Sequence, residues 1–283
     1  MLVVSLTNIG DVVLTTPVMD ALLNAFPQAK LTVVVGPKAW SLYEGQPRIT
    51  TVIFEKRKTL GYYWQWYKDL RSKRFDVIID LRQTFLPLFL WSQWRTPIWA
   101  TKVREHMLKK HLSRLMSVFP QVDVDDKRLS IVSKEIQLPF NDYIVVAPGA
   151  ADEAKRWPIA NFKELIGVLS KRGVNIVCVG DSNDAQLLGG ILEPSFINII
   201  SLAGKTDLRE LGFVLSKSRL LIAHDSGIMH LANYLNVPQV ILWGPTDLEK
   251  YSPWGAEHVV VYKGRDISQI TIKDVLDAIE QIR

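Results

Sequence analysis

Residues 218–236 read "SRLLIAHDSGIMHLANYLN" and change periodicity near their middle. The first part holds an apolar run typical of a buried strand, whereas the apolar positions of the second part recur at the spacing of an amphipathic helix. Asp225, Ser226 and Gly227 stand between the two parts. The stretch therefore predicts a strand-to-helix turn in an α/β protein, where ligands tend to bind.

Strand-like and helix-like runs alternate along the rest of the chain, which favours βαβ units and parallel sheets. The expected strands lie near 2–6, 30–36, 76–81, 143–149, 174–180, 197–204, 220–224 and 239–244. The expected helices lie near 16–26, 159–173, 184–192, 207–218, 228–236 and 271–283. We predict two doubly wound, Rossmann-like domains, with the ligand in the crevice at the carboxyl ends of the strands.

The charged stretch 121–142 has little helical period and predicts the link between the two domains. We expect residues 1–140 to form the first domain and residues 141–265 the second. Residues 266–283 are expected to end in a C-terminal helix that could pack back on the first domain.

Composition describes a globular chain of 283 residues, 48% hydrophobic and 22% charged, which is long enough for two domains with cores of their own. The net charge of +5 and the pI near 9.2 favour an anionic partner. Phosphate esters, nucleic acid and an acidic membrane face all meet that condition, and charge alone does not choose among them.

Cysteine usage and hydropathy exclude two classes of protein. The single cysteine, Cys178, lies in an apolar run, so a disulfide framework and a cysteine metal cluster are excluded and a buried strand residue is expected. The chain opens on a strand-like run without a basic leader, so we expect no export signal. The apolar stretch 84–94 contains Pro87 and is about half the ~20 residues of a spanning helix. We expect a cytoplasmic protein that could also bind a membrane surface.

Two polar groups of the second half follow predicted strands. Lys155 lies in "KRWP", where an ammonium could reach a phosphate; a solvated basic loop is the alternative. Asp184 follows Gly180 at the start of a helix and could accept hydrogen bonds from ribose hydroxyls. It could equally be an N-terminal acid that the helix dipole favours.

The turn at 225–230 predicts an anion site. Ser226 and Gly227 lie where a helix begins, and the backbone N–H groups there could bind a diphosphate. Asp225 is expected to accept hydrogen bonds from sugar hydroxyls. The alternative is that Asp225 caps the helix and His230 packs among its neighbours.

A comparable turn in the first half, "SLTNIGDVVLTTP" at 5–17, places Gly10 and Asp11 in a loop between a strand and a helix. Glycine permits close backbone approach, and an acid at the crevice edge could be the general base for an incoming hydroxyl. The G-x-G-x-x-G spacing is absent, which counts against a dehydrogenase.

Together these motifs resemble the family 9 glycosyltransferases, which include the ADP-heptose:lipopolysaccharide heptosyltransferases. The resemblance covers nearly the whole chain and rests on 9–18, 147–158, 179–184 and, most specifically, "DSGIMHLANYLNVPQVILWGPT" at 225–246. It implies a GT-B fold, with two facing Rossmann-like domains, the nucleotide-sugar in the C-terminal one and the acceptor in the N-terminal one.

The resemblance also implies roles for single residues. Asp11 corresponds to the catalytic base, and Asn8 and Gly10 lie beside it on the acceptor side. The remaining donor-side positions are the phosphate-binding Lys155, the sugar-contacting Asp225, the diphosphate amides of Ser226 and Gly227, and the helix histidine His230. Asp184 stands where the family has a ribose-binding glutamate, and "SLTN" stands where members often have an arginine.

The implied reaction is an inverting transfer of a sugar, expected to be heptose from ADP-heptose, to a lipopolysaccharide-core or related glycan or glycolipid acceptor. Asp11 would take the acceptor proton while Lys155 and the helix amides stabilise the leaving diphosphate, so no metal and no other cofactor is expected. The "DVD" at Asp123–Asp125 has the spelling of a metal-binding motif but lies in the connecting stretch.

Aromatic and basic residues alternate in "EKRKTLGYYWQWYKDLRSKRF" at 55–75. Such a segment suits a bilayer interface or an anionic glycolipid, although a helix with its rings packed on the core is an equal alternative. Lys56, Arg57 and Lys58 are candidates for acceptor binding, with peripheral contact at the cytoplasmic face of the inner membrane.

Three rival classes of protein remain: a nucleotide-sugar epimerase of the same fold, a non-catalytic nucleotide-sugar-binding relative, and a nucleic-acid-binding protein. The last does not explain acids at three strand ends, where they would repel phosphates, so no nucleic-acid partner is expected. The sugar, the nucleotide base, the acceptor and the oligomeric state do not follow from the residues.

Overall fold

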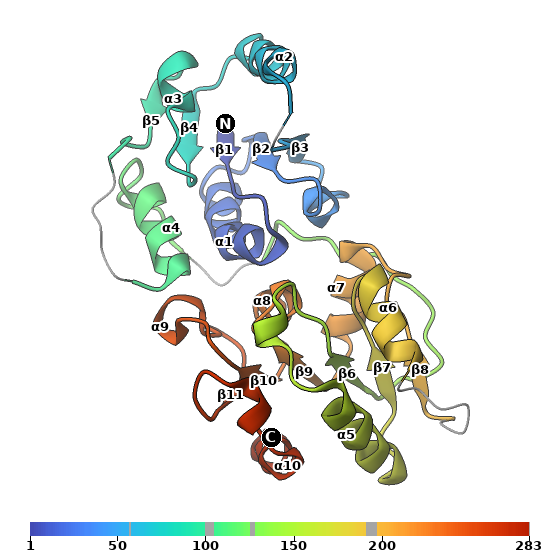
Figure 1. The fold of residues 1–283 in the computed structure, drawn as a ribbon. Coiled ribbons are helices and arrows are strands. Elements are labelled where there is room, and N and C mark those ends of the chain that lie inside the picture. The colour runs from blue at the N-terminus through green and yellow to red at the C-terminus, as the bar shows by residue number, and fades with distance from the viewer. Residues whose placement is uncertain (57, 100–104, 125–127, 191–196, 283) are drawn as a thin grey trace. The chain divides into compact units, whose positions relative to one another are not determined.

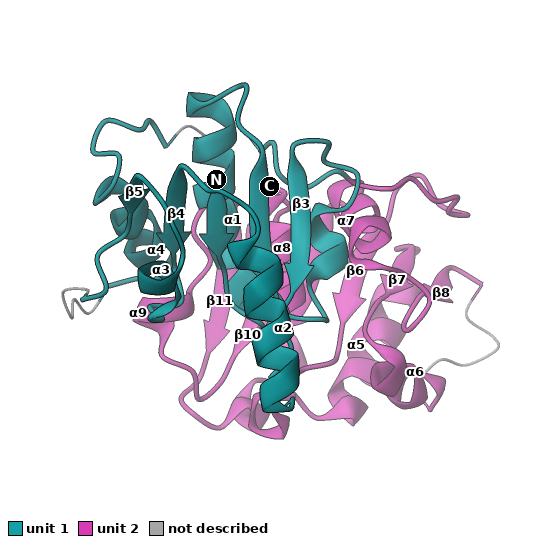
Figure 2. Cartoon of the chain, turned by 90° about the horizontal axis from the view of Figure 1, so that it is seen from above, with its two compact units in different colours: residues 1–132 teal, residues 133–283 magenta. Residues whose placement is uncertain are grey.

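The computed structural model describes residues 1–56, 58–99, 105–124, 128–190 and 197–282. The chain divides into two compact units, Met1–Val132 and Ser133–Arg283 (Figures 1 and 2). Each unit has a parallel sheet of its own, which confirms the predicted fold class of two parallel α/β units.

The first unit contains a five-stranded sheet in the order β3-β2-β1-β4-β5. Its strands are β1 (Leu2–Val4), β2 (Leu31–Val35), β3 (Ile49–Ile53), β4 (Val77–Asp80) and β5 (Trp94–Arg95). Its helices are α1 (Ile9–Ala25), α2 (Leu60–Arg71), α3 (Leu86–Phe89) and α4 (Met107–Met116), with the 3-10 helix η1 (Trp40–Tyr43). The central strands β1 and β4 are buried along their whole length because both faces of a parallel sheet are covered.

The second unit contains a six-stranded sheet in the order β11-β10-β9-β6-β7-β8. Its strands are β6 (Ile144–Ala147), β7 (Ile176–Cys178), β8 (Ile199–Ser201), β9 (Leu220–His224), β10 (Gln239–Trp243) and β11 (His258–Tyr262). Its helices are α5 (Ile159–Lys171), α6 (Ser182–Gly189), α7 (Leu208–Ser216), α8 (Gly227–Tyr234), α9 (Leu248–Tyr251) and α10 (Ile272–Gln281), with the 3-10 helices η2 (Glu153–Lys155) and η3 (Ile267–Gln269).

The division between the two units falls between Val132 and Ser133, a few residues before the expected boundary at residue 140. The C-terminal helix α10 is part of the second unit. Its Val275 and Ala278 lie in that unit's core, because the amphipathic face of α10 covers β10 and β11.

Several elements are longer or more numerous than the sequence pattern predicted. Helix α1 begins at Ile9, so Gly10 and Asp11 lie in its first turn and not in a loop before it. The strands β3 and β11 were not predicted; both are partly exposed, and β3 has two threonines in its middle.

Cys178 is completely buried on β7, as predicted, and forms no disulfide. Burial raises the pKa of its thiol to about 12, which keeps it protonated and unreactive. Within the part of the chain that the structure describes, no helix has the length and apolar character to cross a bilayer.

Gly36, which follows β2, lies against the loop that leads into α1. A Cβ atom at this position would stand 2.3 Å from the carbonyl oxygen of Thr7, and backbone cannot swing away as a flexible side chain can. Close packing of this kind fixes the loop between β1 and Asp11.

We therefore expect Gly36→Ala to destabilise the first unit by roughly 1–3 kcal/mol, the usual cost of overpacking. The matched control is Gly167→Ala on α5, where an added Cβ meets no atom within 4 Å and helix propensity favours alanine. Urea unfolding of both variants measures the difference. Equal stability of the two variants would show that the loop yields without cost.

Candidate functional site

Two loops of the second unit meet because their strands are neighbours. Ala147, the last residue of β6, pairs with Ala223 of β9, so the chain leaves both strands at the same edge. Lys155 ends η2 after β6, and Asp225 directly follows β9. The Lys155 Nζ lies 2.7 Å from Asp225 Oδ2. The structure thus brings together two predicted site residues that are 70 positions apart in sequence.

The burial of this ion pair is unequal. The Asp225 side chain is 6% exposed, whereas the Lys155 side chain is 28% exposed. The carboxylate is therefore held inside the fold, while part of the ammonium group faces outward. A charge-assisted hydrogen bond of this length compensates the burial of both groups.

His224 fastens the "KRWP" loop to β9. Its Nε2 accepts a hydrogen bond from the Trp157 backbone N–H at 2.9 Å, and its Nδ1 lies 3.4 Å from the Gly149 carbonyl oxygen. The Trp157 indole in turn donates to the Ile270 carbonyl oxygen at 2.8 Å. Burial lowers the pKa of His224 to about 4, so the imidazole is neutral and Nε2 is free to accept. The sequence analysis did not identify His224, since its partners are distant in the chain.

Helix α8 begins directly behind Asp225. Ser226 is the N-cap, and its side chain accepts no hydrogen bond from the first turn. Its Oγ is buried, and within the described residues nothing is hydrogen-bonded to it. The N-cap of α8 is thus Ser226 and not Asp225, whose Oδ2 accepts from Lys155. The first turn of a helix offers backbone N–H groups that favour anions.

His230 lies one turn into α8 and is 4% exposed. Its Nε2 is 3.9 Å from Asp225 Oδ1, and its ring is stacked on Trp254 with the centroids 5.8 Å apart. The loop between β10 and β11 is bound to α8 as well, because the backbone N–H groups of Trp254 and Gly255 donate to Asn233 Oδ1. Trp254 was not singled out from sequence, since tryptophan gives no positional signal in a loop.

Asp184 forms a capping box at the start of α6. Its Oδ2 accepts from the Asp181 backbone N–H at 2.9 Å, while Asp181 accepts from the amides of the first turn. A Cβ at Gly149 or at Gly180 would stand within about 2.5 Å of the Asp184 side chain, so both glycines are needed to make room for it. Burial raises the pKa of this carboxyl above its usual range. The helix-cap alternative is therefore present in the structure.

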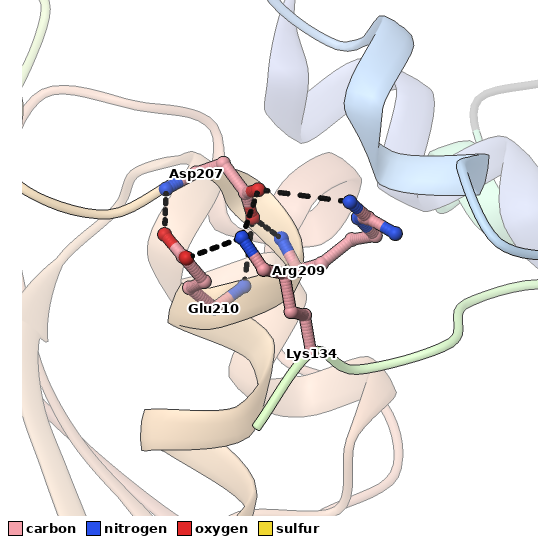
Figure 3. A network of polar contacts seen from close by, with 4 residues as sticks. All are labelled: Lys134, Asp207, Arg209 and Glu210. Carbon is pink, nitrogen blue, oxygen red and sulfur yellow. Dashed lines mark hydrogen bonds and ion pairs between the residues drawn. The ribbon is translucent and has the colours of Figure 1, made fainter. Parts of the chain in front are cut away.

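A polar network surrounds Asp207, the N-cap of α7 (Figure 3). Lys134 Nζ lies 2.7 Å from Glu210 Oε1 and 3.9 Å from Asp207 Oδ2, and Asp207 caps α7. The hydrogen bond from Lys134 lowers the pKa of Glu210. Arg209 Nη2 lies 3.9 Å from Asp207 Oδ2. This network fixes the start of the second unit to α7, and these acids have a structural role.

In the first unit, Asn8 is the N-cap of α1 and its side-chain amide donates to Asp11 Oδ2 at 3.0 Å. Asn8 is exposed and Asp11 is partly exposed. Since the carboxyl ends of parallel strands meet at one edge of a sheet, Asp11 lies at the carboxyl edge of the first sheet, after β1. The amide holds one carboxylate oxygen and leaves the other to accept a proton.

Three basic residues after β3 were predicted to bind the acceptor, and the structure describes two of them, Lys56 and Lys58. Lys56 is exposed, and Lys58 Nζ lies 2.8 Å from Glu55 Oε2. Arg57 lies outside the described residues. So does Asp125 of the "DVD" stretch, whereas Asp123 is exposed.

Two α/β units, each with a parallel sheet, match the GT-B fold of solved heptosyltransferase structures. The model of glycosyltransferase family 9 (heptosyltransferase) matches residues 88–274. The chain belongs to this family, which confirms the resemblance noted in the sequence.

Full-length relatives agree with that assignment. Lipopolysaccharide heptosyltransferase 3 of Escherichia coli is 23% identical over 307 residues, covering 95% of this chain and 90% of the relative. Among solved structures, E. coli ADP-heptose lps heptosyltransferase II superposes with a TM-score of 0.80 at 21% identity, covering 99% of this chain and 97% of that one. E. coli heptosyltransferase WaaC with ADP gives 0.79 at 18% identity, with both chains fully covered.

The neutral imidazole of His224 predicts a pH dependence. Its folded pKa of about 4 lies below the usual 6.5, so the stability it contributes is complete above pH 6.5 and is lost as the pH falls toward 4. The shift corresponds to a loss on the order of 3 kcal/mol. Protonated Nε2 can no longer accept from Trp157, so the "KRWP" loop should loosen first.

We expect His224→Gln to lower stability at pH 7 and to make its fall between pH 7 and pH 5 less steep than in the wild type. Urea unfolding at both pH values measures this. His111 on α4, whose pKa burial also lowers to about 4, supplies the remaining slope and serves as internal control. An unchanged slope in the variant would refute the role given to His224.

Proposed function

We propose that this protein is an inverting, metal-independent glycosyltransferase that moves heptose from ADP-heptose to a lipopolysaccharide-core or related glycolipid acceptor. The observation on which the proposal rests most is the Lys155–Asp225 pair in front of the N-terminus of α8. Family membership supports the reaction class. The name of the relative lipopolysaccharide heptosyltransferase 3 supports heptose as the transferred sugar and lipopolysaccharide as the acceptor. The solved structure of heptosyltransferase WaaC with ADP supports ADP as the nucleotide of the donor.

The donor diphosphate would bind where positive charge and free amides coincide. The first turn of α8 offers backbone N–H groups and the positive end of the helix dipole. Lys155 lies beside this helix start and is partly exposed, so its ammonium can reach a phosphate oxygen without a large rearrangement. An arriving diphosphate would share Lys155 with Asp225, and Asp225 would then accept hydrogen bonds from sugar hydroxyls.

The rest of the nucleotide-sugar would extend over neighbouring strand ends. Asp184 follows β7 and is the candidate for the ribose hydroxyls; its Oδ2 is bound to Asp181, so Oδ1 would accept. His230 lies beside Asp225 with its Nε2 3.9 Å away, and in this proposal it keeps the carboxylate in position for the sugar.

Asp11 would be the general base. The acceptor hydroxyl oxygen attacks the anomeric carbon while its proton passes to the free oxygen of Asp11, and the bond to the diphosphate breaks. The electron pair leaves with the ADP, whose added charge Lys155 and the α8 amides stabilise. Asn8 holds the other oxygen of Asp11 and so fixes the carboxylate's direction. Attack from the face opposite the leaving group inverts the configuration.

Two other activities fit the same fold and donor site, namely a nucleotide-sugar epimerase and a non-catalytic nucleotide-sugar binder. An epimerase would convert the donor without an acceptor, whereas a transferase releases ADP in proportion to glycosylated acceptor. Product analysis with and without acceptor separates the three, because the binder gives no product in either case.

For the donor site, we expect Lys155→Gln to weaken ADP binding by about 10- to 100-fold, since a charge-assisted hydrogen bond to phosphate is lost. Isothermal titration with ADP, at a temperature where the variant is folded, measures the change. The matched control is Lys171→Gln at the other end of α5, which removes the same charge from an exposed position. Equal affinities of the two variants would place the diphosphate elsewhere.

For the base, we expect Asp11→Asn to lower kcat by about 10²- to 10⁴-fold while the Kd for ADP stays within about twofold. Transfer from ADP-heptose to a deacylated core acceptor, followed by mass spectrometry, measures kcat. Asp76→Asn, another exposed acid of the first unit, is the control. Full activity of Asp11→Asn would remove Asp11 from the reaction.

A further inference from the structure

The first unit exposes an unusual number of large apolar side chains in two segments. The first segment is the start of α2, where Leu60 is 87% and Trp64 57% exposed. The second runs from α3 to β5 and includes Phe85, Leu88, Phe89, Trp91 and Trp94, each more than half exposed. We call these seven residues the aromatic face. Large apolar side chains that gather in neighbouring segments and stay exposed are typical of an interaction site.

The two segments are held together by their inward-facing neighbours. The Tyr67 hydroxyl of α2 donates to the Phe89 carbonyl oxygen of α3 at 2.9 Å. Leu90 lies in the core cluster of the first sheet, and Trp66, Tyr67 and Leu86 pack against it. One side of each segment therefore packs on the core, and the exposed side chains of the aromatic face belong to the other side.

Cations surround this surface. Lys68 lies over the Trp64 ring at 5.2 Å, and Arg71 lies over the Tyr67 ring at 6.0 Å. Residues 53–99 contain nine lysines and arginines against four acids. This excess equals the net charge of +5 of the entire chain, so the remaining sequence is electrically balanced. The excess of positive charge thus lies in the stretch 53–99, which includes both segments of the aromatic face.

The aromatic face extends from one end of the first sheet to the other. On α2, the Trp66 indole donates to the carbonyl oxygen of Ile53, the last residue of β3, at 3.1 Å, so the start of this helix lies at the carboxyl end of β3. Trp94 pairs with Val77, the first residue of β4, and so lies at the amino end of that strand. Figure 2 shows α2 and α3 as parts of the same unit.

We propose that the aromatic face docks the protein on an anionic bilayer surface, with tryptophan and phenylalanine rings at headgroup depth and the surrounding cations on lipid phosphates. Indole rings favour the membrane interface, and basic residues beside them bind anionic headgroups. A second copy of this chain is a poorer occupant, because two such faces would bring their cationic rims together. This docking goes beyond sugar transfer and does not depend on the donor.

The test is co-sedimentation of the full chain with large vesicles of phosphatidylcholine alone or with 30% phosphatidylglycerol, in the absence of donor and acceptor. We expect binding to the anionic vesicles that weakens in 0.5 M NaCl. Phe89→Ser/Trp91→Ser should weaken it about tenfold or more, since two exposed rings no longer enter the interface. The Phe89 carbonyl group remains available to Tyr67 in this variant.

Ile197→Ser is the control, because Ile197 is 93% exposed in the second unit and lies outside the aromatic face. It should bind vesicles as the wild type does. Thermal unfolding and ADP affinity of both variants report on folding and on the donor site, so a failure of docking is distinguishable from a failure of the proposed transferase.

Quenching of tryptophan fluorescence by brominated lipid gives a second readout, and Trp91→Phe should reduce it. The proposal is overturned if wild-type protein stays in the supernatant with anionic vesicles, or if both variants sediment equally with them. It is also overturned if the double variant changes only the oligomeric state in analytical ultracentrifugation, which would make the face a contact between copies.

Discussion

The adjacency of β6 and β9 is the constraint on which the site of the second unit depends. Parallel pairing places the ends of both strands at one edge, and the buried imidazole of His224 then binds the loop after β6 through the Trp157 backbone. Only with this loop fixed does Lys155 reach Asp225. A neutral histidine suits the position, because a protonated ring would present a donor to a donor.

In the proposed donor site, the Lys155–Asp225 pair would also stabilise the lysine before a diphosphate binds. A partly buried ammonium group needs a counter-charge, and Asp225 supplies it from the next strand end. The proposed donor would exchange that partner for phosphate oxygens and release the carboxylate for the sugar. One short contact would thus serve the empty and the occupied site.

Sequence reasoning recovered the parallel α/β class, most strands of the second unit and the turn at 225–230, because apolar runs and the switch in periodicity are local signals. It missed the partly exposed strands β3 and β11, of which β3 has a polar middle. It also placed Asp11 in a loop, because Pro17 inside α1 suggested a helix start several residues too late. His224 and Trp254 could not be found from sequence, since their roles arise only from contacts across the fold. For Asp184, local pattern allowed a cap and a ligand equally, and the capping box in the structure is compatible with both.

The strand order has a consequence for how the second unit is made. β6 is the first strand of that unit to be synthesised, yet it lies in the middle of the sheet. One of its edges stays unpaired until β9 has been synthesised. The two halves of the ion pair leave the ribosome 70 residues apart. Non-local pairing of this kind is slow to form. During translation β6 therefore has one unpaired edge until β9 emerges, and unpaired strand edges of this kind favour aggregation.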